Sequence, residues 1–201
     1  DVMAAVARRL GLADGITPTE VAVYFGRPGR RDPDPYFGGA GPERAGCIEC
    51  GGCMVGCRYE AKNTLDRNYL YLAEQGGAEV FAEHTVVDLE PAGSGWRVTT
   101  ERPGAWLRKR RRTFEADHVV FSAGALGTTR LLQQLRHAGR LPRISERLGH
   151  LVRPNSESLR GAVARDTSVA YSRGVAITSW VETDRHTRME PVRYPAGSNA
   201  M

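Results

Sequence analysis

Four cysteines lie close together in this 201-residue chain and are the residues best suited to chemistry. They form a C-x2-C-x2-C-x3-C run at Cys47, Cys50, Cys53 and Cys57. The same spacing holds iron–sulfur clusters in bacterial ferredoxins, because the short steps let successive thiolates face one cluster. Arg58 stands where those proteins have a proline. Since there is only one run, a single cluster would need all four thiols or a ligand from outside it.

Other chemistry fits the same run. Zinc would prefer two separated cysteine pairs, whereas local disulfides or four reduced thiols packed at a domain junction need no metal. The basic residues Arg58 and Lys62 would stabilise thiolates in any ligand site. The spacing therefore predicts an iron–sulfur site at the four cysteines and leaves these alternatives open.

A strand, a glycine-rich turn and a helix are predicted in succession near the middle of the chain. Residues 116–121 are rich in β-formers, residues 122–127 read S-A-G-A-L-G, and residues 128–135 have helical spacing of leucines. This order can bring backbone amides and a helix N-terminus toward a cofactor phosphate. It also serves to pack a helix closely on a strand.

The remaining elements follow from periodicity and from turn residues. Residues 96–100 and 113–116 should pair as a hairpin across a basic tip. Residues 26–46 are too rich in Gly, Pro and Asp for regular structure. Helices are predicted over 1–13 and 64–75, and strands over 21–25, 79–89, 167–171, 174–181 and 190–197.

The net charge of +5 is concentrated in residues 108–112, between a Pro-Gly turn and a predicted strand. A solvated hairpin tip explains this run better than nucleic-acid binding, because no aromatic stacking platform or recognition helix accompanies it. No apolar run approaches the roughly 20 residues of a membrane helix. We therefore expect no nucleic-acid partner and no transmembrane segment. Because metal-binding cysteines must stay reduced, a cytoplasmic location is favoured.

Several segments, in order along the chain, together resemble one enzyme family. The chain is similar to the glucose-methanol-choline oxidoreductases, and within them to the cholesterol oxidase branch. The segments that carry the resemblance are Gly56-Cys57, Lys62 to Asp66, Tyr69-Leu70, His84 to Val86, Ala123 to Thr129, Leu131-Leu132, Leu141-Pro142, Leu148-Gly149 and Pro154 to Ser156.

The resemblance implies an α/β (mixed α+β) fold, in which an FAD-binding Rossmann-type domain is interleaved with a mixed-sheet substrate domain. Residues 1–78 would be a helix, loop and Cys-rich linker, residues 79–155 part of the FAD-binding domain, and residues 156–201 the start of the substrate domain. It also implies oxidation of an alcohol, with a sterol as a candidate, by hydride transfer to FAD. An oxidase would reduce oxygen, whereas a dehydrogenase would use another electron acceptor.

Five site residues are carried over by the resemblance. Val86 matches a valine whose backbone holds the adenine, and Gly124 and Gly127 match a small-residue turn packed by the flavin. Asn155 matches an asparagine close to the isoalloxazine. Glu190 matches a glutamate in the substrate cavity that accepts a proton, and burial beside an apolar substrate would raise its pKa.

Glu190 also has a simpler interpretation. Arg188 and Arg193 are close to it in the sequence, so a surface Glu–Arg pair is an alternative. His186 lies in a polar run typical of a solvated turn, and we assign it no role.

The phosphate-binding G-x-G-x-x-G of such flavoproteins is absent from the sequence. We therefore expect the chain to be incomplete at both ends, to bind FAD weakly or not at all by itself, and to show no turnover. Two other functions stay open. The chain could be an iron–sulfur electron-transfer module of a flavin dehydrogenase, or a non-catalytic scaffold that has kept the fold.

Overall fold

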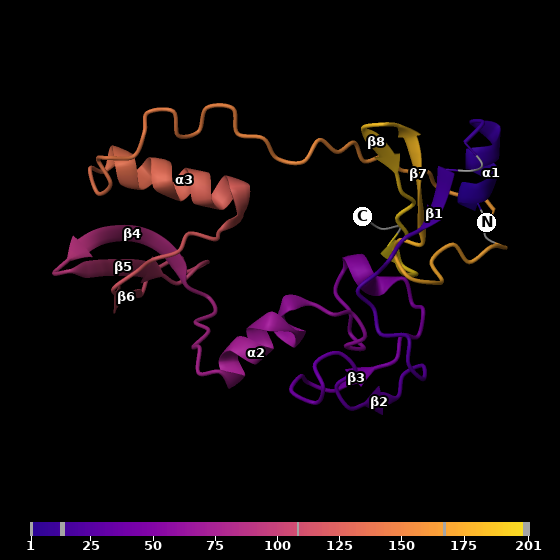
Figure 1. Cartoon of the computed structure of the whole chain (residues 1–201), viewed down its shortest axis with the longest axis horizontal. Helices are drawn as coiled ribbons and strands as arrows, with labels where there is room; N and C mark the ends of the chain where they lie inside the picture. Colours follow the sequence, from indigo (N-terminus) through magenta and orange to yellow (C-terminus); the bar gives the residue numbers. More distant parts are fainter. Residues whose placement is uncertain (1, 13–14, 108, 167, 199–201) are drawn as a thin grey trace. The chain divides into compact units, whose positions relative to one another are not determined.

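The computed structural model describes residues 2–12, 15–107, 109–166 and 168–198, and the chain divides into two compact units (Figure 1). Unit 1 comprises Asp1–Glu79 and Val163–Met201. Unit 2 comprises Val80–Ala162. The functional divisions predicted at residues 78 and 155 stay predictions.

The core of unit 1 forms where a short helix packs on a small antiparallel sheet. Helix α1 (Val2–Arg9) faces strand β7 (Ser179–Asp184), which lies between β1 (Ile16–Pro18) and β8 (Thr187–Met189). Met3, Ala7 and Val181 are buried together. Helical spacing places Met3 and Ala7 on one face, and this face packs against Val181 of β7. Figure 1 shows α1 beside β1.

The loop region of unit 1 contains two-residue strands, β2 (Arg31–Asp32) and β3 (Arg44–Ala45). Between them, the Asp34 carboxylate accepts hydrogen bonds from four backbone N–H groups, those of Tyr36, Phe37, Gly39 and Gly41. Burial by itself would raise the pKa of Asp34, but the four donors outweigh it and hold this pKa below its usual value. The loop predicted over 26–46 is therefore ordered around one carboxylate.

The helix predicted over residues 64–75 is divided in two. A 3-10 turn, η3 (Leu65–Arg67), precedes α2 (Tyr69–Gln75). Asn68 lies between them at φ −133° and ψ −107°, and its side chain accepts a hydrogen bond from the Tyr69 N–H. This local hydrogen bond competes with a continuous helix.

Unit 2 is an antiparallel meander with one helix against it. Strands β4 (Thr85–Ala92), β5 (Gly95–Glu101) and β6 (Arg111–Ala116) pair in sequence order. The register pairs Trp96 with Ala116 and Thr100 with Arg112, which confirms the predicted hairpin. Helix α3 (Gly124–His137) contacts β4 (Figure 1).

An ion-pair group fixes the end of α3 to β4. Just beyond the helix, Arg140 donates to both carboxylate oxygens of Asp88, at 3.1 and 2.8 Å, and also pairs with Glu90 at 3.0 Å. The hydrogen bonding of Arg140 to the Asp88 carboxylate is the main reason that the pKa of Arg140 is raised. Leu89 on β4 and Leu135 on α3 are both 2% exposed. The helix is therefore fixed to the strand by apolar packing and by a bidentate ion pair.

Several predicted strands do not form. Residues 21–25 make only an isolated bridge from Val23 to Lys62, and residues 168–171 and 190–197 have no strand structure; position 167 lies outside the described residues. Of the strand predicted over 116–121, only Ala116 lies in a strand, at the end of β6. A strand needs a hydrogen-bonding neighbour, and the β-rich residues 117–121 have none among the described residues. β-Propensity alone therefore overestimates the sheet.

The observed architecture is a mixture of helices and antiparallel strands, as the predicted mixed fold class requires. The interleaved Rossmann arrangement stays a prediction. No helix of the described part combines the length and apolarity needed to cross a bilayer.

Candidate functional site

A cavity of about 970 Å³ opens in unit 2 between β4 and α3. The segment 119–123 forms a further part of its wall, and Val98, Glu101 and Lys109 contribute from the hairpin. The lining from the two main elements comprises Thr85, Val86, Val87, Asp88 and Leu89 on β4, and Gly127, Arg130, Leu131, Gln134 and Leu135 on α3.

Helical periodicity explains which side of α3 lines the cavity. Ala123 at the N-cap position and Gly127, Arg130, Leu131 and Gln134 recur every three or four residues, and so they share one face. Sequence analysis named Gly127 on this face and missed Arg130. Helical spacing counted on from Gly127 would have predicted that Arg130 lies on the same face of the helix.

Val86 lies on a strand with a free edge. Strand β4 is at the border of its sheet, so along the side away from β5 its backbone groups have no strand partner in the described structure. The register slips between Val86 and Asp88, which marks a β-bulge at this edge. The Val86 residue is 36% exposed and lines the cavity. Its position suits a main-chain contact with a ligand.

The two candidate glycines are needed for different reasons, Gly127 for close packing and Gly124 for its backbone conformation. Gly127 faces Ala123, and a Cβ atom added to it would lie 3.2 Å from the Ala123 Cβ, so a small residue allows close packing. Gly124 has open space around it but a φ of +73°, a left-handed conformation that disfavours other residues. Only Gly127 lines the cavity.

The charges around the cavity leave one cation available. Asp88 is paired with Arg140. Glu101 is paired with Arg111 at 2.9 Å and Lys109 at 3.4 Å, and the hydrogen bond from Arg111 is the main cause of its lowered pKa. Among the described lining residues, Arg130 is the cation without an ion pair, so the cavity favours an anionic group near α3.

Asn155 and Glu190 lie outside the cavity lining. Asn155 is exposed, and its side-chain amide donates to Glu157 at 3.2 Å. Glu190 follows β8 in unit 1 and is also exposed, so the burial expected for a proton acceptor beside an apolar substrate is not present. The alternative surface pair is not formed either. Arg188 pairs with Glu182 at 3.2 Å, and Arg193 donates to the carbonyl oxygen of Arg173.

The four cysteines converge on a second, much smaller cavity in unit 1. Its volume is about 10 Å³, and Cys47, Cys50, Cys53 and Cys57 all line it. All four are free thiols, and Cys50 is exposed. Burial is the main reason that the pKa of Cys47 is raised, although the Glu49 N–H donates to its sulfur at 3.3 Å and opposes the shift.

These thiols do not make a ready ligand set for a metal. In the described part of the chain, no three or more His, Cys, Asp or Glu side chains are placed to hold one. A cavity of about 10 Å³ has room for roughly one water molecule. The predicted iron–sulfur cluster therefore has no support from this geometry.

Comparison with known proteins identifies the family. The model of the GMC oxidoreductase family matches residues 42–149, more than half of the chain. The chain belongs to the GMC oxidoreductase family. The matched segment contains both the cysteine run and the cavity between β4 and α3, so this GMC chain carries its main candidate site within the part that matches the family.

Two relatives cover nearly all of the chain. A cholesterol oxidase of Mycobacterium tuberculosis is 52% identical over 98% of the chain, and a cholesterol oxidase of Acinetobacter baumannii is 45% identical over 96%. The chain spans only 35% and 36% of the length of these relatives. No solved structure matches it.

Proposed function

We propose that this chain is the central part of an FAD-dependent oxidoreductase that oxidises the CH–OH group of an alcohol. The observation that carries the proposal is the cavity of unit 2. Val86 and Gly127, which the family resemblance assigns to FAD, line it from different elements. Bound FAD would supply the flavin that accepts a hydride from the alcohol carbon.

The residues of the cavity suit the polar parts of such a cofactor. The free edge of β4 offers backbone groups for a flat, hydrogen-bonding ring at Val86. The first turn of α3 has N–H groups without intrahelical acceptors, and Arg130 adds a positive charge on the same face. Gly127 has no side chain, so the helix at this position takes up little of the cavity. These features together favour a ligand with an aromatic end and an anionic part.

For the substrate we propose an alcohol, with a sterol as the first candidate. The names of the two bacterial relatives support a sterol, and their identity to this chain is 45–52%. We also propose that Glu190 accepts the hydroxyl proton and that Asn155 lies near the reacting ring. Glu190 has no arginine partner among the described residues, so its carboxylate is available for this role.

A cytoplasmic location is supported by the four free thiols.

A chimera tests the proposed reaction. This chain would replace the matching segment of the Mycobacterium tuberculosis relative, and oxidation of cholesterol and of short secondary alcohols would be measured. We expect turnover with the sterol, and a drop of at least about 100-fold in kcat for Glu190→Gln, because a positioned base contributes about 100- to 10,000-fold. Glu182→Gln is the matched control in the same unit, because Glu182 has its own arginine partner. A folded chimera that oxidises none of these alcohols would contradict the proposal.

A further inference from the structure

The tip of the β5–β6 hairpin presents two large apolar side chains to solvent. Trp106 is 91% exposed and Leu107 is 85% exposed. They follow a turn at Pro103 and Gly104, where Gly104 has a φ of +72°. Exposing an adjacent Trp and Leu costs solvation free energy, so a turn that displays both needs an explanation.

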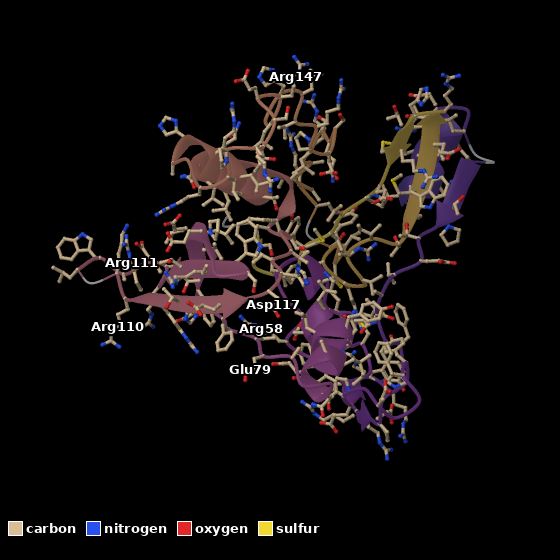
Figure 2. All side chains as sticks on the ribbon, turned by 60° about the vertical axis from the view of Figure 1, so that its left-hand side comes forward. Arg58, Glu79, Arg110, Arg111, Asp117 and Arg147 are labelled. Atoms are coloured by element: carbon tan, nitrogen blue, oxygen red, sulfur yellow. The ribbon has the colours of Figure 1, made fainter. Side chains whose placement is uncertain are left out.

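Positive charge surrounds this apolar tip. Lys109 and Arg111 share a single carboxylate, Glu101, and Arg110 has no ion pair among the described residues. Figure 2 shows Arg110 and Arg111 at the end of the hairpin, with the Arg110 side chain directed away from the sheet. The tip therefore carries a surplus of positive charge beside exposed apolar surface.

Arg112, which follows the tip on β6, is held in a different way. The guanidinium of Arg112 lies 4.4 Å from the Phe81 ring centroid and 4.6 Å from that of Phe114. The two rings are themselves 4.8 Å apart. Arg112 is thus held against the sheet by cation–π contacts and is not displayed at the tip. The free charges are confined to the tip.

We propose that this tip, residues 103–107 and 109–111, docks onto the surface of an anionic phospholipid bilayer. Tryptophan is favoured at the headgroup level, where its ring is partly buried and its N–H stays hydrated. Leu107 would enter the acyl boundary beside it, while Lys109 and Arg110 contact lipid phosphates. A nucleic acid fits less well, because Leu107 offers it no stacking surface. Lys109 also lines the cavity between β4 and α3, but the docking itself does not depend on the proposed oxidation chemistry.

Vesicle co-sedimentation of the full chain tests the proposal. The vesicles contain phosphatidylcholine and phosphatidylserine in about a three-to-one ratio, or phosphatidylcholine alone. We expect binding to the anionic vesicles that weakens as salt is added. Arg110→Gln should reduce the affinity about fivefold, and Trp106→Ala should reduce it at least about tenfold.

Two matched variants in the same unit serve as controls. Arg147→Gln removes one exposed arginine, and Leu159→Ala removes an apolar side chain that is 89% exposed; both should leave binding unchanged. Figure 2 shows Arg147 on a different part of unit 2 from the hairpin. In a variant with Trp96→Phe and Trp180→Phe, the emission of Trp106 should shift to the blue when anionic vesicles are added.

Three results would overturn the proposal. Equal binding to the two kinds of vesicle would exclude charge recognition, and equal binding of the wild-type chain and Trp106→Ala would exclude the tip. Salt-dependent binding of polyglutamate without binding to vesicles would point to an acidic protein as the partner. Because Trp106 and Arg110 lie on the surface, their replacement should leave the circular dichroism spectrum unchanged, so a loss of binding cannot be assigned to unfolding.

Discussion

Two glycines at the start of α3 should respond to alanine in opposite directions. Gly124 has a φ of +73°, so a Cβ atom there is strained even though no neighbour touches it, and Gly124→Ala should lower the free energy of unfolding by about 1–2 kcal/mol. Gly127 lies inside the helix without a positive φ. Gly127→Ala should raise the free energy of unfolding by up to about 1 kcal/mol, because alanine is the better helix former.

The contact at Ala123 sets an upper limit on the gain at Gly127. A new Cβ would lie 3.2 Å from the Ala123 Cβ, so Ala123 must move by a few tenths of an ångström. The two variants should still differ by about 2 kcal/mol. With a urea slope of about 2 kcal/mol per molar, their unfolding midpoints should differ by about 1 M.

Urea unfolding followed by Trp96 fluorescence measures this difference. Trp96 lies on β5, and it reports on unit 2 once Trp106 and Trp180 have been replaced by phenylalanine. Equal midpoints for the two alanine variants would refute the assigned backbone conformation of Gly124. A midpoint for Gly127→Ala below that of Gly124→Ala would show that the wall of the cavity is tighter than the structure indicates.

Three further predictions follow from burial and hydrogen bonding. Leu135→Ala should lower the free energy of unfolding by about 2–5 kcal/mol in urea titrations, because Leu135 is 2% exposed; a loss under about 1 kcal/mol would contradict the packing of α3. In the folded chain the pKa of Asp34 lies below its ordinary value of 3.8. The ionised carboxylate therefore stabilises the loop fully at pH values above 3.8, and this stabilisation is lost as the pH falls through the pKa of the folded state. Asp34→Asn should therefore speed hydrogen exchange at the four bonded amides at neutral pH, and unchanged rates would contradict this role. Iodoacetamide should modify exposed Cys50 before Cys47, whose pKa is raised by burial, and peptide mapping that finds the reverse order would contradict the geometry.

The sequence predicts local structure well where one short segment contains all the information. The pairing of residues 96–100 with 113–116 is correct, because two β-rich runs flank a turn and need no distant partner. The helix predicted over 128–135 is present and extends to Gly124–His137, because its apolar spacing is regular. Val86 and Gly127 do line one cavity, although the resemblance, and not the local pattern, selected them.

The sequence fails where structure depends on groups outside the segment. Residues 117–121, most of the strand predicted over 116–121, are rich in β-formers, but β-propensity cannot supply a hydrogen-bonding neighbour. The spacing of the four cysteines matches a cluster ligand run, yet spacing does not fix where each sulfur points or how much space lies between them. Burial of Glu190 was an expectation from the family likeness, and the carboxylate is exposed.

The central claim is that the cavity between β4 and α3 forms part of an FAD site. The most direct measurement is the flavin content of the chimera with the Mycobacterium tuberculosis relative, taken from its visible absorbance after gel filtration, with and without Gly127→Leu. The account predicts that the chimera retains FAD. It also predicts that the Gly127→Leu variant loses FAD, because the leucine side chain would occupy part of the cavity. A folded chimera without flavin, or a Gly127→Leu variant that retains FAD as well as its parent does, would contradict it.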